Sequence, residues 1–475
     1  MPFCRECAFE VQATWKFCPN CNNAQPQPDS SSSIQSTNLN LDSSLVQGDV
    51  NITQNNAEDI ANAMVKALER LGFSGQTTPA ELTPAQEKEV EQVLELSEQL
   101  TGHGIEIDPW TEITLGNAAE LAGRTHSAQQ HYLRALETYR KNGDRKGEAA
   151  SLNNLGIIAQ RRGNNAEAEA LYRNCLVISR EIGYREGDAA SLNHLGVIAR
   201  VRGDLAEAER LHRESLAIKK EIGDRKGMAA SLNNLGNIAQ TRGKNKSAEL
   251  LYKRSLDVVR DIGDRQGEAG SLNNLGVIAE TRGDLAEAER LQRESLAIKR
   301  EIGDRKGETG SLYNLGIIAE TRGDLAEAER LYRESLAIER EIGNRQGEAA
   351  SLYNLGVIAE TRGDLAEAER LHLESLVIRR EIGDREGEAD SLNTLGLIAE
   401  IRGDLDEAER LHRESLAIKR EIGDRKGEAA SLNNLGIIMQ KKDQFDEAHR
   451  MYTDAVRIKR EIGIPIDQWF IDNGY

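Results

Sequence analysis

A Leu-Gly pair that returns every forty residues limits this chain to a repeat architecture. The pair stands at Leu115-Gly116 and recurs without insertion or deletion until Leu435-Gly436, which gives nine copies. The stretch ETRGDLAEAERL is identical at 280–291, 320–331 and 360–371. A fixed period of this length is typical of solenoids, in which each unit packs only on its neighbours. We therefore expect one continuous stack rather than several separate cores.

Apolar residues follow helical spacing twice within each repeat. In residues 188–222, the first predicted helix ends at Gly203 and the second begins after Asp204. The two helices are expected to be antiparallel and joined by a short turn. Gly196 suits a close crossing of the two backbones, with Ala208 on the opposite side of the contact. The repeats are therefore predicted to be all-α.

The pattern resembles that of the tetratricopeptide repeats over residues 109–463. The residues that carry the resemblance in one repeat are Leu192, Leu195, Gly196, Ala199, Ala208, His212 and Leu216. The period is 40 residues rather than the usual length of about 34, and the GDRxGE connector is similar to that of kinesin light chains and LGN/Pins polarity adaptors. The resemblance implies a right-handed superhelical solenoid of about nine helix-turn-helix repeats. It also implies that a protein or peptide ligand binds in a concave groove lined by the first helices.

A polar residue precedes the Leu-Gly pair in each later repeat. We call this set the asparagine row; its members are Asn154, His194, Asn234, Asn274, Asn314, Asn354, Thr394 and Asn434. An Asn carboxamide offers both a donor and an acceptor, so a row of them can bind the backbone of an extended peptide. The resemblance to kinesin light chains and LGN-type adaptors implies the same use, with His194 and Thr394 setting register or specificity.

The asparagine row has a second interpretation, in which its side chains bind the neighbouring repeat and hold the stack together. The residue before each member is also Asn in most repeats, but Tyr313 and Tyr353 replace it in two of them. These two tyrosines are candidate aromatic anchors near the middle of the groove. Peptide contact and inter-repeat bonding both remain open at this point.

Four cysteines near the N-terminus form a predicted metal site. Cys4, Cys7, Cys18 and Cys21 have the spacing C-x2-C-x10-C-x2-C. Two thiolate pairs complete a tetrahedral Zn²⁺ site and leave no open position for catalysis. We therefore expect residues 1–22 to be a zinc ribbon, similar to those at the start of many prokaryotic proteins, that structural Zn²⁺ folds.

The segment between the ribbon and the repeats is predicted to contain a linker and a small module. Residues 23–37 are polar and rich in Ser, as flexible linkers are. Residues 38–75 suggest two short strands, at 38–42 and 45–53, and an amphipathic helix at 57–71. This module either self-associates into a homo-oligomer through its edges and apolar face, or packs against the first helices of the solenoid.

Both ends of the solenoid are predicted to be covered. Residues 83–108 read as an N-terminal capping helix and connector, with Thr83, Pro84 and Gln86 as N-cap, first-turn proline and capping-box residue. Residues 464–475 include Trp469 and Phe470, and we expect them to form a C-terminal hydrophobic cap on the last repeat. The alternative is insertion into the groove of another copy.

Several functional classes lack support in the sequence. There is no P-loop, Rossmann fingerprint or GxSxG motif, so we expect no enzyme. The net charge is −18 with no basic stripe, which disfavours a nucleic-acid partner. With no membrane-length apolar run and no signal peptide, the expected location is cytoplasmic.

Two functions remain as candidates. The first is a non-enzymatic scaffold or adaptor that binds an extended peptide segment of a partner in its groove. The alternative is a regulatory or signalling protein whose zinc ribbon contacts nucleic acid or the transcription machinery while the repeats sense a partner.

Overall fold

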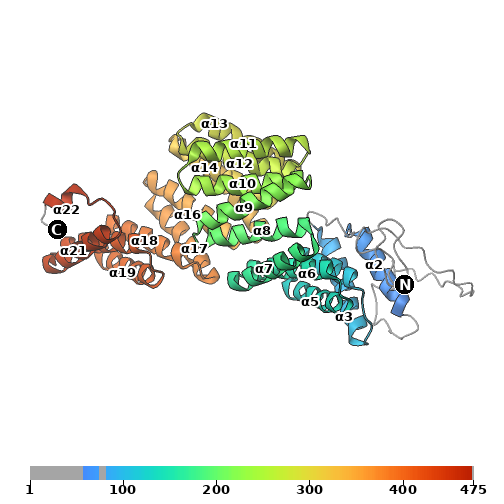
Figure 1. Ribbon diagram of the computed structural model, residues 1–475. Coiled ribbons are helices and arrows are strands. Elements are labelled where there is room, and N and C mark those ends of the chain that lie inside the picture. Colours follow the sequence, from blue (N-terminus) through green and yellow to red (C-terminus); the bar gives the residue numbers. More distant parts are fainter. Residues whose placement is uncertain (1–56, 74–81, 473–475) are drawn as a thin grey trace, which may run out of the picture. The chain divides into compact units, whose positions relative to one another are not determined.

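The computed structural model describes residues 57–73 and 82–472, and every regular element in these ranges is an α-helix (Figure 1). The predicted all-α tetratricopeptide-type solenoid is thus confirmed. The zinc ribbon (1–22), the linker (23–37) and the strands predicted at 38–42 and 45–53 lie outside the described residues.

The helices come in repeated pairs after two leading helices. The leading helices are α2 (Ala57–Arg70) and α3 (Pro84–Gly102). The repeat helices of the N-terminal half are α4 (Pro109–Leu121), α5 (Thr125–Asn142), α6 (Arg145–Arg161), α7 (Asn165–Ile182), α8 (Arg185–Val201), α9 (Leu205–Glu221) and α10 (Arg225–Thr241). Those of the C-terminal half are α11 (Asn245–Asp261), α12 (Arg265–Thr281), α13 (Leu285–Glu301), α14 (Arg305–Thr321), α15 (Leu325–Glu341), α16 (Arg345–Thr361), α17 (Leu365–Ile382), α18 (Arg385–Arg402), α19 (Leu405–Glu421), α20 (Arg425–Lys441) and α21 (Phe445–Glu461), followed by the short α22 (Gln468–Asp472).

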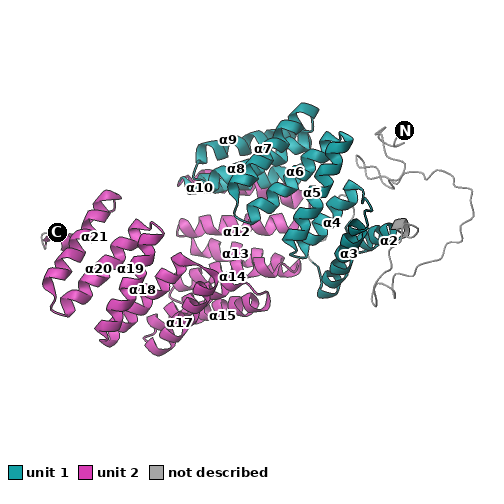
Figure 2. Cartoon of the chain, turned by 90° about the horizontal axis from the view of Figure 1, so that it is seen from below, with its two compact units in different colours: residues 1–242 teal, residues 243–475 magenta. Residues whose placement is uncertain are grey.

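The chain divides into two compact units, residues 1–242 and residues 243–475 (Figure 2). Unit 1 holds α2, α3, the pairs α4/α5, α6/α7 and α8/α9, and α10. Unit 2 begins with α11 and continues with the pairs α12/α13, α14/α15, α16/α17, α18/α19 and α20/α21. Within each unit the helices of a pair contact one another, and so do the second helix of one pair and the first helix of the next.

Recurring Asp and Gly residues set the helix ends. Oδ1 of Asp304 accepts a hydrogen bond from the Gly307 amide at 2.7 Å, and Oδ1 of Asp324 accepts one from the Glu327 amide at 3.1 Å. These are N-caps, which satisfy amides that have no partner within the helix. Gly303, just before the first cap, has φ of +74°, a backbone conformation that side chains disfavour. The GDRxGE and GDLAEAE motifs therefore each encode a helix stop followed by a helix start.

The glycine of the Leu-Gly pair makes room for a side chain on the second helix of its repeat. A Cβ added at Gly316 would lie 2.4 Å from Cε1 of Tyr332, and one at Gly196 would lie 2.7 Å from Nε2 of His212. The close approach at Gly196 therefore accommodates His212, and Ala208, the predicted partner, is fully buried on the same second helix. The equivalent side chains in other repeats, also against their own glycines, are Tyr132, Tyr172, Gln292, His372, His412 and Tyr452.

Ion pairs join helices within a repeat and between successive repeats at constant sequence offsets. Arg345 pairs with Glu381 at 2.5 Å, 36 residues later, and so joins α16 to α17 of the same repeat. Arg340 pairs with Glu374 at 2.5 Å, 34 residues later. Arg362 pairs with an acid 33 residues earlier, Glu329. Most of these side chains are largely exposed, so a single ion pair stabilises the fold by at most about 1 kcal/mol. Their combined contribution comes from the recurrence of the pairs in many repeats.

The apolar face of α2 is covered within the chain. Ile60, Met64 and Leu68 are buried, and α2 contacts α3 and α4. This is the packing alternative of the sequence analysis, so the face that suggested self-association is not available for it. A homo-oligomer formed through other residues remains an untested prediction. Helix α3 begins with the expected capping box between Thr83 and Gln86.

The C-terminal segment packs on the last repeat. Phe470 of α22 is buried and lies in a T-shaped contact with Tyr452 of α21, with ring centroids 5.7 Å apart. Lys459 of α21 pairs with Asp467 at 2.6 Å. Trp469 remains 45% exposed, so part of this aromatic surface faces solvent.

Candidate functional site

The exposed side of the first helices forms a continuous face in each unit. First helices of successive repeats contact one another directly: α6 with α8, α8 with α10, and α12 with α14. Each buries its Leu-Gly side, so the opposite side, which carries the asparagine row, lies at the surface. We call this surface the inner face, and the surface formed by the second helices the outer face.

Asparagines of the row bond to the preceding repeat at three places. Nδ2 of Asn314 donates to Oδ1 of Asn273 at 3.1 Å. The same bond joins Asn234 to Asn193 at 3.1 Å and Asn434 to Asn393 at 2.9 Å. Each bond uses one amide hydrogen of the donor and one oxygen of the acceptor, which leaves further N–H and C=O capacity in both carboxamides. Inter-repeat bonding is therefore present and leaves hydrogen-bonding groups for a ligand.

The other three asparagines of the row lie at the same place on their first helices. Asn154, Asn274 and Asn354 are half-buried on the inner face of their helices. Asn314 donates to Asn273, 41 residues earlier. The residue 41 positions before Asn354 is Tyr313, so a tyrosine replaces the carboxamide acceptor there. The row therefore contains asparagines in two local settings.

The two exceptions in the row lack an accessible carboxamide. The ring of His194 stacks on Tyr172, with centroids 4.6 Å apart and planes 7° from parallel. Burial lowers the pKa of His194 to about 4, so its imidazole is neutral at physiological pH. Thr394 is buried, and its hydroxyl donates to the carbonyl of Asp390 at 3.1 Å. The row is thus interrupted once by a stacked aromatic ring and once by a buried hydroxyl.

The two predicted aromatic anchors differ in accessibility. Tyr313 is 36% exposed, and its ring centroid lies 6.0 Å from that of Tyr332. Tyr353 is held by its neighbours: its hydroxyl lies 3.2 Å from Oγ1 of Thr394, and the guanidinium of Arg379 lies 4.8 Å from its ring centroid. Tyr313 is therefore the better placed of the two to meet a ligand.

Two further rows flank the asparagines, and the sequence analysis did not identify them. Four residues before the row lies a small residue in all but one repeat: Ala150, Ala190, Ala230, Gly270, Gly310, Ala350 and Ala430, with Asp390 as the exception. A Cβ placed on Gly270 or Gly310 would meet nothing within 4 Å, so the space above them is open. Three residues after the row lies an aliphatic residue in all but one repeat: Ile157, Val197, Val277, Ile317, Val357, Leu397 and Ile437, with Asn237 as the exception. Both rows are visible in the sequence once the repeats are aligned at forty residues.

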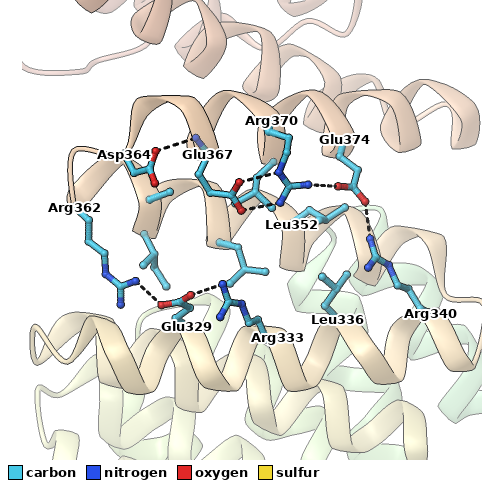
Figure 3. Close-up of a pocket in the computed structure, with 14 residues that line it drawn as sticks. Glu329, Arg333, Leu336, Arg340, Leu352, Arg362, Asp364, Glu367, Arg370 and Glu374 are labelled. Atoms are coloured by element: carbon cyan, nitrogen blue, oxygen red, sulfur yellow. Dashed lines mark hydrogen bonds and ion pairs between the residues drawn. The ribbon is translucent and has the colours of Figure 1, made fainter.

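A cavity of about 480 Å³ opens on the outer face of unit 2 (Figure 3). It lies between α15 and α17, over a floor that includes Leu352, Leu355 and Ile358 of α16. The arginines of its rim are all paired: Arg362 and Arg333 with Glu329, Arg340 with Glu374, and Arg370 with Glu367 and Glu374. The pairs of Arg362 with Glu329 and of Arg340 with Glu374 bridge neighbouring repeats, and those of Arg333 and Arg370 lie within one helix, so the rim presents no unpaired cation to a ligand.

The cysteine and metal-ligating residues of the described part do not form a site. Cys175 is buried, and burial raises the pKa of its thiol, as expected for a packed residue. Within residues 57–73 and 82–472, no group of three or more His, Cys, Asp or Glu is placed to hold a metal ion. The predicted zinc ligands Cys4, Cys7, Cys18 and Cys21 lie outside these ranges. No helix in the described part of the chain is long and apolar enough to cross a membrane.

Comparisons with solved structures find many similar folds. A STAND-class signal transduction ATPase with a tetratricopeptide repeat sensor, PH0952 from Pyrococcus horikoshii, matches 88% of this chain and 67% of its own, with 14% identity and a TM-score of 0.58. BtubC (BKLC) from P. vanneervenii matches 46% of this chain and 92% of its own, with 22% identity and a TM-score of 0.42. No curated protein matches the chain significantly.

A family model decides the classification. The tetratricopeptide repeat model matches residues 147–221, 227–301, 308–381 and 387–461, which together exceed half of the chain. These ranges coincide with the helix pairs and with the Leu-Gly and second-helix contacts described above. The chain therefore belongs to the tetratricopeptide repeat family.

Proposed function

We propose that this protein is a non-enzymatic interaction scaffold that binds an extended segment of a partner protein along its inner face. The observation that carries the proposal is the set of inter-repeat bonds from Asn234, Asn314 and Asn434, which fix these carboxamides while leaving donor and acceptor groups unused. Side chains held in place before binding lose little conformational entropy on binding. We also propose, from the 40-residue period, that the array is of the kinesin light chain and LGN/Pins type.

The dimensions of the inner face support this mode of binding. Packed helices lie about 8–10 Å apart, and three residues of an extended chain span about 10 Å. Each repeat therefore meets about three peptide residues and offers one carboxamide to their backbone. The side chains of an extended peptide point alternately to its two sides. The open small-residue row and the aliphatic row offer a different surface to each side.

We expect alanine substitutions in the row to weaken peptide binding without unfolding the protein. The test uses the full chain to select ligands from a displayed library of unstructured peptides of about 16 residues, followed by fluorescence anisotropy with the selected peptides. The variant N314A/N354A/N434A is expected to bind them at least about tenfold more weakly, because each lost bond to a ligand contributes about 0.5–1.5 kcal/mol. Its helical circular dichroism should be unchanged.

A matched pair of variants separates the two roles of the asparagines. N314A/N434A and N273A/N393A break the same two inter-repeat bonds, from the donor side and from the acceptor side respectively. If the row binds peptide, the donor-side variant loses more affinity than the acceptor-side variant. Equal losses of stability with equal binding in the two variants would show that these asparagines only hold the stack together.

We further propose that residues 1–22 bind one structural Zn²⁺ through Cys4, Cys7, Cys18 and Cys21. Purified full-length protein is expected to contain about one zinc per chain by elemental analysis, and C18S to lose it, because three thiolates do not complete the tetrahedral site. Zinc content equal in C18S and the unmodified protein would contradict this assignment. Contact between the ribbon and nucleic acid, the alternative function, would appear as salt-dependent binding to DNA or RNA that C18S loses.

A further inference from the structure

One glutamate position on the inner face pairs with a Lys or Arg of the next repeat near both ends of the array, whereas in the middle repeats it forms no ion pair with a Lys or Arg of the described residues. The position lies five residues after the leucine of the Leu-Gly pair. Near the N-terminal end, Glu120 pairs with Arg161 of the next repeat at 2.8 Å. Near the C-terminal end, Glu400 pairs with Lys441 of the next repeat at 2.7 Å. The acids at this position in the repeats between are Glu280, Glu320 and Glu360.

The residue that supplies the cation at the ends is uncharged in the middle. Arg161 and Lys441 each stand 41 residues after the acid they neutralise. The equivalent residues for the three middle acids are Thr321, Thr361 and Ile401. The two threonine hydroxyls donate to carbonyls of their own helices, Thr321 to Ile317 and Thr361 to Val357, both at 2.8 Å. Ile401 has no donor and is 67% exposed.

Among the described residues two of these acids meet a tyrosine hydroxyl or a histidine ring, and Glu360 is paired with a cation only when that ring is protonated. Glu320 accepts from the hydroxyl of Tyr332 at 3.3 Å, and Oε1 of Glu360 lies 2.6 Å from Nε2 of His372. In the Glu280 repeat, Gln292 stands at the second-helix position that Tyr332 and His372 occupy in the next two repeats. Its amide nitrogen donates to the carbonyl of Asn273 at 3.0 Å, and its Oε1 is buried with no hydrogen-bond partner among the described residues.

In the Glu280 repeat, the amide of Gln292 donates to a backbone carbonyl of the first helix. Gln292 is fully buried and its oxygen has no donor, while burial raises the pKa of Glu280, which is the behaviour of a carboxylate without a compensating cation. A desolvated carboxylate is stabilised by the charged N–H groups that a basic ligand brings.

We propose that the inner face of unit 2 selects a basic partner segment, whose Lys or Arg side chains bind Glu280, Glu320 and Glu360 in place of the cations present at the ends. This inference rests on the proposed peptide-binding function and narrows its ligand to one of complementary charge. One acid per repeat, about every 10 Å, matches about three residues of an extended chain. The long, flexible side chains of Lys and Arg tolerate a small mismatch in that spacing.

The test uses the full-length protein and fluorescein-labelled peptides of about 15 residues, one of alternating Lys and Ser and one of alternating Glu and Ser. The Lys peptide is expected to bind at least about tenfold more tightly than the Glu peptide, with an affinity that falls as NaCl rises from about 50 to about 500 mM. The variant E280Q/E320Q/E360Q is expected to lose that preference and most of the salt dependence. Gln already occupies this position at Gln160, Gln240 and Gln440, so the substitutions suit the fold.

The control removes the same charge elsewhere. Glu301, Glu341 and Glu381 lie at or near the C-terminal ends of second helices, with side chains 59%, 60% and 55% exposed, each paired with an arginine. E301Q/E341Q/E381Q is expected to bind the Lys peptide within about twofold of the unmodified protein, because solvent screens distant exposed charges. Equal weakening in the two triple variants would overturn the proposal, since net charge alone would then explain binding.

A reciprocal variant supplies the missing cations from within the chain. T321K/T361K reproduces the Glu400–Lys441 arrangement beside Glu280 and Glu320 and is expected to block the Lys peptide at least about tenfold. Unchanged binding by this variant, or a Lys peptide that binds no better than the Glu peptide, contradicts the basic ligand. Library-selected peptides that need the asparagines but show no preference for Lys would leave the scaffold function standing alone. A Lys peptide that needs the glutamates but not the asparagines would retain the charge selection and remove the carboxamide contact.

Discussion

Gly316→Ala is expected to lower the free energy of unfolding by about 1–3 kcal/mol, as overpacking of a tight core does. The added methyl group would lie 2.4 Å from the ring of Tyr332, which is itself fully buried and cannot move into solvent. Either the ring leaves its preferred rotamer or α14 and α15 separate. Urea unfolding followed by circular dichroism at 222 nm measures the change.

Gly310→Ala in the same helix provides the control. A Cβ at Gly310 meets nothing within 4 Å, and its φ is not in the left-handed region. Replacing a helical glycine by alanine at an open position is expected to raise the free energy of unfolding by about 0.5–1 kcal/mol, through lower chain entropy in the unfolded state. The two substitutions add the same atom to one helix, so opposite signs isolate the contact with Tyr332. Destabilisation by both would instead point to a general intolerance of α14.

Acidification is expected to destabilise the repeats well above the pH at which carboxylates titrate. Burial lowers the pKa of His212 to about 4 and that of His412 to about 4, with Lys219, Arg200 and His194 acting in the same direction on His212 and Glu400 in the opposite direction on His412. The ring nitrogens of both histidines are buried and have no hydrogen-bond partner among the described residues. Each ring therefore remains neutral in the folded protein.

The sign of the effect follows from proton linkage. An exposed histidine in the unfolded chain has a pKa of about 6.5, so between about pH 6.5 and pH 4 the unfolded state binds more protons than the folded state. The stability contributed by the neutral rings is complete above about pH 6.5 and falls as the pH drops through this window. At pH 5 the loss is about 2 kcal/mol for each histidine.

The variant H212Q/H412Q tests this assignment, because Gln292 already fills the same position in another repeat. Urea midpoints measured between pH 7 and pH 5 are expected to fall steeply for the unmodified protein and much less for the variant. A variant with the same slope as the unmodified protein would assign the acid sensitivity to other groups.

Most of the helical architecture can be predicted from the sequence because the signals are local. The helix predicted at 57–71 is found at 57–70, and the first-helix stop at Gly203 and second-helix start after Asp204 agree with α8 and α9. Capping residues and a glycine at each turn act within four residues of one another. The contact of Gly196 with His212 is not local in this sense, because the two residues lie on different helices. The contact depends on the crossing of those helices, so the sequence did not single out His212 as the residue against Gly196.

The candidate site could be predicted only in part. The periodicity alone places the asparagine row on the surface of the first helices, where the structure has it. The partners of those asparagines could not be found from one repeat, since Asn314 and Asn273 are 41 residues apart and meet only through stacking. Nor does the sequence pattern of α2 show whether its apolar face meets the solenoid or a second chain. The two flanking rows, and the inner-face glutamates that pair with no Lys or Arg among the described residues, become visible only when equivalent positions are compared across repeats.

The bonds between repeats also determine how such a chain changes in length. Ion pairs and carboxamide bonds join residues of neighbouring repeats at offsets of 33, 34 and 41, each close to the forty-residue period. Duplication or loss of one whole forty-residue block preserves every one of these offsets. Any other insertion changes the offset of every bond whose two residues lie on either side of it. Recombination between near-identical blocks therefore changes the array in steps of one repeat, and each step adds or removes one position of the asparagine row.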